Sequence, residues 1–331
     1  MLSSNPVAAA MNISDDLNVG PYVNTIIYKV IANQDQRMLA LQAGEIEMDT
    51  SFFDPVHYAI LDDFGDIAIF SALRNGYGHI TINCRDWPLN ETVLRQAFAY
   101  AFDKTRVTSE IMNGWSQEHD SLVPYANGWC IEDELPFHYY TTQIVIGNTL
   151  LNASGLFPYG GDGYRTYRGQ AFDIEIEYSS CSCEISGGTA QIGVDALLAL
   201  GINARTRAAD FNEYISRLDN HGNYDMVYYA LNFYNNDVDW LAYEYWSAYA
   251  DVPYQNPTNF RNATYDACRE QLLHGTTYEE VYNASSWMQR ILHEQVPRLV
   301  VYENTYNQAY RTDRFTGHVP DLAATSLVRG P

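Results

Sequence analysis

The chain has 331 residues, of which 47% are hydrophobic, and a formal net charge of −22. This composition indicates a soluble globular chain long enough for two lobes, with no apolar run of about 18 residues that would span a membrane. The negative charge argues against nucleic-acid binding, because such a surface repels phosphate backbones. No basic segment followed by an apolar stretch marks a signal peptide.

The first quarter of the chain alternates between predicted strands and short helices. Asn33 is expected to cap a helix that ends at Gly44, and Asp54 with Pro55 is expected to open another. Strands are predicted for three segments with alternating or β-rich composition: 23–31, 67–71 and 78–83.

The rest of the chain predicts an α/β layer. Residues 115–140 and 156–170 are expected to be irregular, because they are rich in Gly, Pro and Tyr. Helices are predicted at 91–103, 105–113, 141–153, 189–200, 211–219, 262–273 and 277–295. Strands are predicted at 172–178, 202–208, 224–231, 298–304 and 306–317. The alternation of strands and helices from 172 to 231 favours a largely parallel sheet.

Two helices carry a capping signature. Asp210 with Glu213 precedes the helix at 211–219, and Thr277 with Glu280 precedes the helix at 277–295. In a capping box the first side chain and the glutamate satisfy backbone N–H groups reciprocally.

Five cysteines leave at least one thiol without an internal partner. Cys130 has two open alternatives, a disulfide to Cys181 or Cys183 in an oxidising compartment, or a free buried thiol. The spacing of Cys181 and Cys183 is tighter than that of zinc sites.

Motifs that would indicate an enzyme are missing from the sequence. Nucleophile-elbow, zinc-protease and phosphate-loop patterns do not occur, and the eight histidines lack ligand spacing. We therefore expect no catalytic residue, no cofactor and no metal. A secreted carbohydrate-active hydrolase is the weaker alternative, since such enzymes need only two carboxylates and 41 acidic residues are present.

Several blocks in one order resemble the extracellular solute-binding proteins of the oligopeptide, dipeptide and nickel type, which are components of ABC transporters. In the most specific block, a strand with Asn83 precedes a helix carrying Arg95, Ala97, Ala101 and Asp103. The blocks lie at 20–48, 75–107, 112–124, 198–231 and 291–317.

The resemblance implies an α/β, two-lobed, periplasmic-binding-protein-like fold of type II, in the peptide-binding cluster. Mixed sheets flanked by helices would be joined by hinge strands. Residues 1–84 would belong to lobe I, 85–303 would form lobe II, and 304–331 would return to lobe I. The N-terminal part of the family is expected to be missing from this chain.

The resemblance also implies a function. The chain would be the substrate-binding receptor of an ABC importer, outside the cytoplasm on the cell surface or in the periplasm. It would capture a peptide or similar small solute by hinge closure and then dock on permease subunits. A sensory or adhesive surface module on the same fold is the alternative.

Candidate ligand-binding residues gather after the predicted strand at 224–231, where open α/β sheets bind ligands. This segment is rich in carboxamides, carboxylates and aromatic rings, although the same residues also make turns. Members of the family often place an aspartate there for the ligand's amino group; the nearest positions here are Asn232 and Phe233, with Asp237 and Asp239 later. The predicted ligand-binding set is Tyr77, His79, Trp129, Tyr229, Asn232, Tyr234, Asn235, Asp237 and Trp240.

Two residues that could contact a ligand have a structural alternative. Trp129 is interpreted chiefly as a cap on the core of lobe II. Arg95 is interpreted as a structural salt bridge rather than a clamp for a carboxylate. Nickel capture, known in some relatives, is unsupported because the histidines lack ligand spacing; His79 would be its one candidate.

Overall fold

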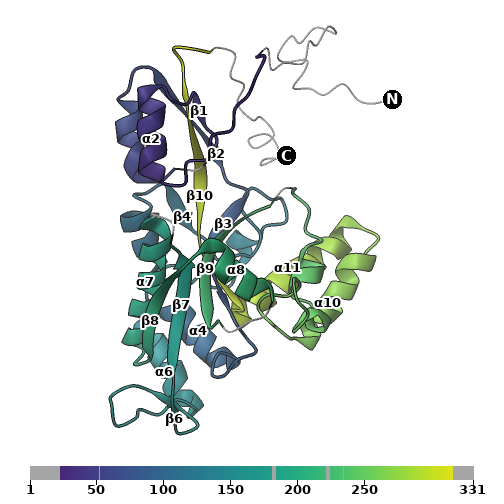
Figure 1. Ribbon diagram of the computed structural model, residues 1–331. Helices are drawn as coiled ribbons and strands as arrows, with labels where there is room; N and C mark the ends of the chain where they lie inside the picture. The colour runs from purple at the N-terminus through teal and green to yellow at the C-terminus, as the bar shows by residue number, and fades with distance from the viewer. Residues whose placement is uncertain (1–22, 52, 181–183, 221–223, 234, 316–331) are drawn as a thin grey trace. The chain divides into compact units, whose positions relative to one another are not determined.

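The computed structural model describes residues 23–51, 53–180, 184–220, 224–233 and 235–315 (Figure 1). The chain divides into two units, residues 1–31 and 32–331. In the first unit the described residues 23–31 form neither helix nor strand, and Ile27 and Val30 are exposed. The predicted strand at 23–31 is therefore wrong. Alternation alone does not make a strand, which also needs a partner for its backbone hydrogen bonds.

The second unit contains a mixed sheet with the strand order β1-β10-β3-β9-β7-β8, in which β2 and β4 also pair with β10. β7 is parallel to both β8 and β9, whereas β3 is antiparallel to β9 and β10. The parallel part is the predicted βαβ segment. The strands are β1 (Met48–Asp49), β2 (Ile67–Leu73), β3 (Gly76–Ile82), β4 (Ser116–Glu118), β7 (Asp173–Ser179), β8 (Asn203–Ala209), β9 (Met226–Asn232) and β10 (Arg298–Arg311).

β10 is one strand of 14 residues rather than the two that we predicted. Its first residues pair with β3, Tyr302 to Asn304 pair with β4, and Thr305 to Arg311 pair with β2. The register against β3 shifts between Val300 and Tyr302. β10 therefore continues as one strand while its pairing partner changes from β3 to β4 and then to β2. A sequence pattern does not show which strand pairs with which.

Most of the predicted helices are present, and their ends follow the predicted caps. The Asn33 side chain accepts a hydrogen bond from the backbone of Gln36, and Gly44 ends the helix in the left-handed conformation. The helices and turns are α2 (Gln34–Ala43), η1 (Pro55–His57), α3 (Tyr58–Asp62), α4 (Thr92–Ala101), α5 (Lys104–Arg106), η2 (Val107–Ile111), η3 (Glu132–Glu134), α6 (Ile144–Ser154), α7 (Glu184–Ala199), α8 (Phe211–Asp219), α9 (Leu241–Glu244), η4 (Ser247–Tyr249), α10 (Ala263–His274) and α11 (Tyr278–Gln295).

The two predicted capping boxes have different outcomes. Thr277 and Glu280 form the full box at the start of α11. Asp210 caps α8 by accepting from the backbone of Asn212, but the Glu213 carboxylate is held by Arg207 and Arg217. The box of α8 is therefore only half formed. Within the predicted loop at 156–170 and just beyond it, β5 (Thr166–Tyr167) and β6 (Gln170–Ala171) make a small hairpin.

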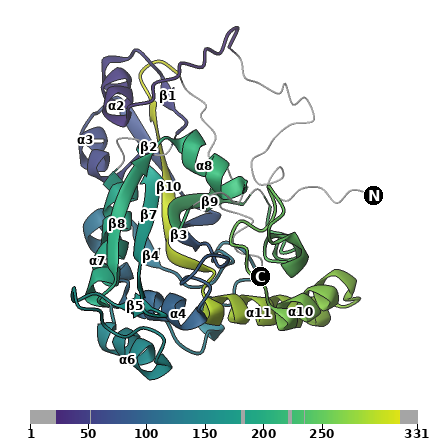
Figure 2. The same cartoon turned by 60° about the horizontal axis from the view of Figure 1, so that its bottom comes forward.

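The buried apolar side chains form separate clusters. The largest cluster lies where α4, α6 and α7 cover one face of the sheet, and a small cluster lies under α8. Successive residues of β9 alternate between them: Met226 and Tyr228 belong to the first cluster and Val227 to the second. The two clusters therefore lie on opposite faces of the sheet. Another cluster fills the space around α10 and α11, which pack side by side (Figure 2). A further one joins α2, α3 and β2 to Ala309 of β10.

The lobe boundaries at 84/85 and 303/304, and the hinge, stay predictions; residues 1–22 and 316–331 lie outside the described residues. Cys84, Cys130 and Cys268 carry free thiols, while Cys181 and Cys183 also lie outside the description. None of the described helices combines the length and apolar content needed to cross a bilayer.

Candidate functional site

Three predicted residues meet on the antiparallel pair of β3 and β9. His79 lies directly opposite Tyr229 in the register, and their ring centroids are 4.1 Å apart. Tyr77 precedes them on β3, with its ring 5.5 Å from that of His79. Tyr77 and His79 are fully buried, whereas Tyr229 is half-buried. Burial, with Arg298 adding to it, holds the pKa of His79 well below its usual range, so this imidazole is neutral.

Arg298 at the start of β10 is the charged group nearest to these rings. Its guanidinium donates to Glu244 at 2.5 Å and to the Tyr229 hydroxyl at 3.4 Å. The hydroxyl groups of Tyr77 and Tyr245 and both ring nitrogens of His79 have no hydrogen-bond partner among the described residues. Buried polar atoms are thus concentrated where β3, β9 and β10 meet, next to the predicted ligand-binding residues.

The loop that follows β9 is anchored by two residues that sequence reasoning did not select. Arg74 donates from Nε to Asn232 at 2.6 Å and from Nη1 to Asn304 at 3.3 Å. The Asn75 carboxamide donates to the backbone oxygens of Phe233 and Asn235, at 3.0 and 3.1 Å. The short link between β2 and β3 therefore holds the start of the loop in place. Its polarity was visible in the sequence, but its contacts about 160 and 230 residues away were not.

Polar side chains within the loop satisfy local backbone groups. Asp237 Oδ1 accepts from the Val238 N–H at 2.9 Å, and Asn235 Oδ1 accepts from the Asp237 N–H at 3.3 Å. Asn232, Asn235 and Asp237 are nonetheless exposed. A side-chain oxygen that accepts a hydrogen bond within the loop can still accept one from a ligand, because each carboxylate or carboxamide oxygen has more than one lone pair. The local turns therefore do not prevent these side chains from binding a ligand.

Aromatic rings extend from β3 into the loop. The ring of Phe233 lies 5.6 Å from Tyr77 and 4.7 Å from Trp240. Trp129 instead packs against Tyr278 and Tyr282 of α11, at 5.1 and 6.3 Å, as a cap on the cluster around α10 and α11. Tyr234 lies outside the described residues. The structure thus brings together Tyr77, Phe233 and Trp240, and places Trp129 in its core-capping alternative.

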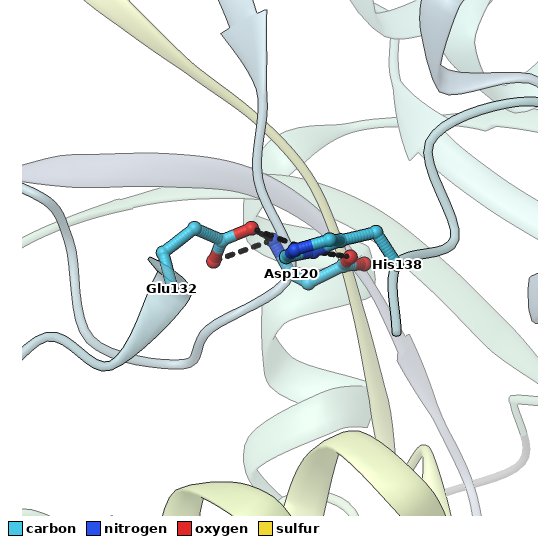
Figure 3. A group of neighbouring side chains, drawn as sticks. All are labelled: Asp120, Glu132 and His138. Atoms are coloured by element: carbon cyan, nitrogen blue, oxygen red, sulfur yellow. Dashed lines mark hydrogen bonds and ion pairs between the residues drawn. The ribbon is translucent and has the colours of Figure 1, made fainter. Parts of the chain in front are cut away.

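A second group of chemically active side chains lies after β4. His138 Nδ1 is 2.9 Å from Asp120 and 3.5 Å from Glu132, and the three residues offer ligand atoms within 4.8 Å of one another (Figure 3). We predicted neither this cluster nor a metal site. Of the described residues, these are the three that could hold a metal ion.

The surroundings of this cluster favour a charge-compensated network over a metal centre. Lys104 donates to Asp120. Glu132 accepts from the backbone of Asp120 and Ser121 and from the Tyr140 hydroxyl, at 2.5 to 3.0 Å. These donors occupy most of the lone pairs that a cation would need.

The protonation of the network follows from these contacts. Burial alone would raise the pKa of Asp120, but Lys104 and His138 outweigh it and hold that pKa well below its usual range. The hydrogen bond to Asp120 raises the pKa of His138. Burial lowers the pKa of the neighbouring His293 to about 4. At neutral pH the network therefore combines an ionised Asp120 carboxylate with a neutral, buried His293 imidazole.

Arg95 does not form the salt bridge that we predicted. Its guanidinium is 2% exposed and donates to the backbone oxygens of Gln295 and Leu89 and to Thr92 Oγ1. No ion pair of Arg95 occurs among the described residues. The end of α11 instead supplies a neutral backbone acceptor, the Gln295 oxygen, to Arg95.

Comparison with known proteins places this chain in a family. Residues 17–252 match the family model described as bacterial extracellular solute-binding proteins, family 5 Middle. The chain is 22% identical over 216 residues to the oligopeptide-binding protein AppA of Bacillus subtilis (strain 168), covering 63% of this chain and 38% of the relative.

Solved structures share the fold at low identity. AppA from Bacillus subtilis in complex with a nonapeptide superposes with a TM-score of 0.78 and 16% identity, over 91% of this chain and 59% of that one. NikZ from Campylobacter jejuni in complex with Ni(L-His) superposes with a TM-score of 0.74 and 17% identity, over 86% and 56%. The predicted type II periplasmic-binding-protein-like α/β fold is confirmed, and this chain spans little more than half of these solved chains. The chain belongs to the bacterial extracellular solute-binding proteins of family 5.

Proposed function

We propose that the chain is the capturing part of a receptor that takes up peptides or similar small solutes for an ABC importer. Family membership supports this proposal, as does the likeness to AppA, whose solved structure holds a nonapeptide. The receptor would work outside the cytoplasm and hand its ligand to permease subunits. No bond is made or broken in such a function.

The observation that carries the proposal is the anchored loop of residues 232–240 beside β3. Exposed carboxamides and carboxylates at Asn232, Asn235 and Asp237 offer the donors and acceptors that a peptide backbone requires. The Phe233 and Trp240 rings supply apolar surface at the same place. A loop held by Arg74 and Asn75 presents these groups with little loss of entropy on binding.

Arg74 also indicates which end of a ligand would be recognised. A guanidinium flanked by the carboxamides of Asn232 and Asn304 is suited to a carboxylate, since arginine binds carboxylates through two parallel hydrogen bonds. The carboxylates of Asp237 and Asp239 belong to the exposed part of the loop that Arg74 anchors. In our proposal, the loop acidic groups receive the cationic end of a solute and Arg74 its carboxylate.

Closure over the ligand would use the segments that join the α2–α3 cluster to the rest of the sheet. These segments are the link at Arg74 and Asn75 and the middle of β10, where pairing passes from β3 to β2. Bending at few residues while packed clusters stay intact is the usual form of hinge motion.

A thermal-unfolding screen of the purified chain tests the proposal. Di- to nonapeptides, oligosaccharides and divalent metal ions are added separately. A ligand at about 100 times its Kd stabilises the native state by about 2.7 kcal/mol, so one class is expected to raise Tm clearly. A cooperative transition that no class shifts would contradict solute capture by this chain.

Variants then test the loop. Asn232→Ala and Asp237→Ala are each expected to weaken binding of the active class about tenfold, measured by isothermal titration calorimetry. Asp162→Ala is the matched control, because exposed Asp162 also makes a local turn, accepting from the Tyr164 N–H. Equal affinities in all three variants would place the ligand elsewhere.

A further inference from the structure

A cavity of about 310 Å³ lies at the start of α4, and none of the predicted ligand-binding residues lines it. Its wall contains three of the chain's 17 arginines, Arg85, Arg95 and Arg261, and one carboxylate, that of Asp251. The chain as a whole has a formal net charge of −22. The charged groups of this cavity wall are therefore mainly positive, whereas the chain as a whole is negative.

Arg95 is the buried member of this wall. Its three donors bind neutral acceptors, and no described carboxylate pairs with it. A buried charge without a counter-charge is costly unless a partner compensates it. The cavity is the place where a negatively charged partner would meet it.

Arg85 and Arg261 share a carboxylate across the cavity. Arg85 Nη1 lies 3.5 Å from Asp251 Oδ1, and Arg261 Nη2 lies 2.7 Å from Asp251 Oδ2. Arg85 also lies 3.2 Å from Asp86. Of these two carboxylates only that of Asp251 lines the cavity, and neither is paired with Arg95.

Two uncharged side chains, Asn90 and Thr92, also line the wall beside Arg95. Asn90 contributes a carboxamide, and Thr92 is the first residue of α4, a helix of 10 residues. The N-terminus of a helix carries a partial positive charge that favours anions. These groups alone would not define a site, but they lie beside the uncompensated guanidinium.

We propose that this cavity binds a small solute through an oxyanion, either a phosphate or a carboxylate group. Arg95 is the fixed, buried anchor, and the half-exposed Arg85 and Arg261 turn from Asp251 toward the ligand. Both oxyanions fit the planar guanidinium through two hydrogen bonds. A volume near 310 Å³ is at the lower end of small-molecule sites. The site goes beyond the proposed capture function, because it shares no residue with the loop at 232–240.

The test is thermal unfolding and calorimetry of the whole chain in sodium phosphate, in sodium succinate and in sodium chloride, at equal ionic strength. We expect phosphate, succinate or both to raise Tm by about 3 °C over chloride at saturation. The anion that acts identifies the oxyanion class. Equal Tm values in all three salts would overturn the proposal.

Four single variants and one double variant separate binding from a structural role of the arginines. Arg85→Gln and Arg261→Gln are each expected to weaken anion binding about tenfold. Asp251→Asn is expected to strengthen it about tenfold, because both guanidinium groups lose their competing carboxylate; a purely structural role predicts no such gain. Arg106→Gln is the control, since exposed Arg106 also pairs with two carboxylates. Wild-type affinity in the Arg85→Gln/Arg261→Gln double variant would contradict the site.

Discussion

Buried histidines make the stability of the folded chain sensitive to acid, and His293 is the clearest case. His293 is 3% exposed, its ring lies 4.7 Å from Phe137 and 4.9 Å from Tyr139, and its nitrogens have no hydrogen-bond partner among the described residues. Asp120 is its nearest charged neighbour, 3.9 Å away. Burial among these rings disfavours the imidazolium, and this explains the direction of the pKa shift.

The pH dependence of stability follows from this residue. The folded pKa of His293 is about 4, and the unfolded value is about 6.5, so below pH 6.5 the unfolded chain binds the proton more strongly. The stability present above pH 6.5 is therefore lost as the pH falls toward 4, by up to about 3 kcal/mol. We expect His293→Phe, which keeps the ring contacts, to flatten this loss in urea unfolding between about pH 7 and pH 4.5.

An exposed histidine supplies the control. His274→Phe changes a side chain at the exposed end of α10 and is expected to keep the wild-type slope. If His293→Phe showed the same slope as wild type, acid sensitivity would have to come from other buried groups, of which His79 is one.

At the level of residues, the sequence located the loop but not its supports. Asn232, Asn235 and Asp237 stood out because polar and aromatic residues follow a strand within a few positions. Arg74 contacts Asn304, 230 residues away, and Asp120 contacts Lys104 and His138, 16 and 18 residues away. Composition and spacing carry no information on such contacts, which depend on how the segments pack.

Among the elements, α6 shows how a single glycine sets a helix end. Gly155 ends α6 with φ 68°, and a Cβ there would meet no atom within 4 Å. Gly128 is equally open but has no positive φ. Gly155→Ala is therefore expected to lower the free energy of unfolding by about 1 kcal/mol, from backbone strain alone.

Gly128→Ala is the matched control for that change. With space for the methyl group and no left-handed backbone, it is expected to be neutral or slightly stabilising, by less than about 1 kcal/mol in urea unfolding. Equal destabilisation by both changes would show that the added methyl group, rather than the backbone conformation, is responsible.

Elements with local start and stop signals were predicted well. Asn33, Gly44, Thr277 and Glu280 fix helix ends through contacts within a few residues, and the structure confirms them. The strand at 23–31 and the division of β10 were wrong, because a strand is defined by its neighbours and not only by its side-chain pattern. The antiparallel placement of β3 between β9 and β10 was beyond the reach of local signals for the same reason.

For the whole molecule, the excess of acidic residues predicts a dependence on salt. Exposed ion pairs contribute little each, whereas a net charge of −22 repels itself throughout the folded chain. Raising sodium chloride from about 0.01 M to 0.15 M shortens the screening length from about 30 Å to about 8 Å. We expect Tm to rise over this range in a scanning calorimeter. A falling Tm would mean that surface ion pairs outweigh the repulsion.

The family and the fold could be predicted from the sequence because its blocks occur in the family order, even though identity to the matched relative is only 22%. Each block is a packing element, and order together with spacing preserves a fold when individual residues change. The lobe boundaries and the hinge stay predictions, because a sequence pattern does not show how packed clusters move relative to each other.

The route of β10 through the sheet also determines the order in which the chain completes its fold during synthesis. β2 is made before β10, yet within the described part of the chain its strand partner is the segment 305–311 of β10. Until that segment leaves the ribosome, β2 presents an unpaired edge that can join another chain. The helices and the parallel strands between them can form from neighbouring sequence. The cluster of α2, α3 and β2 has to wait for Ala309, so this region is exposed to misassembly until β10 has been made.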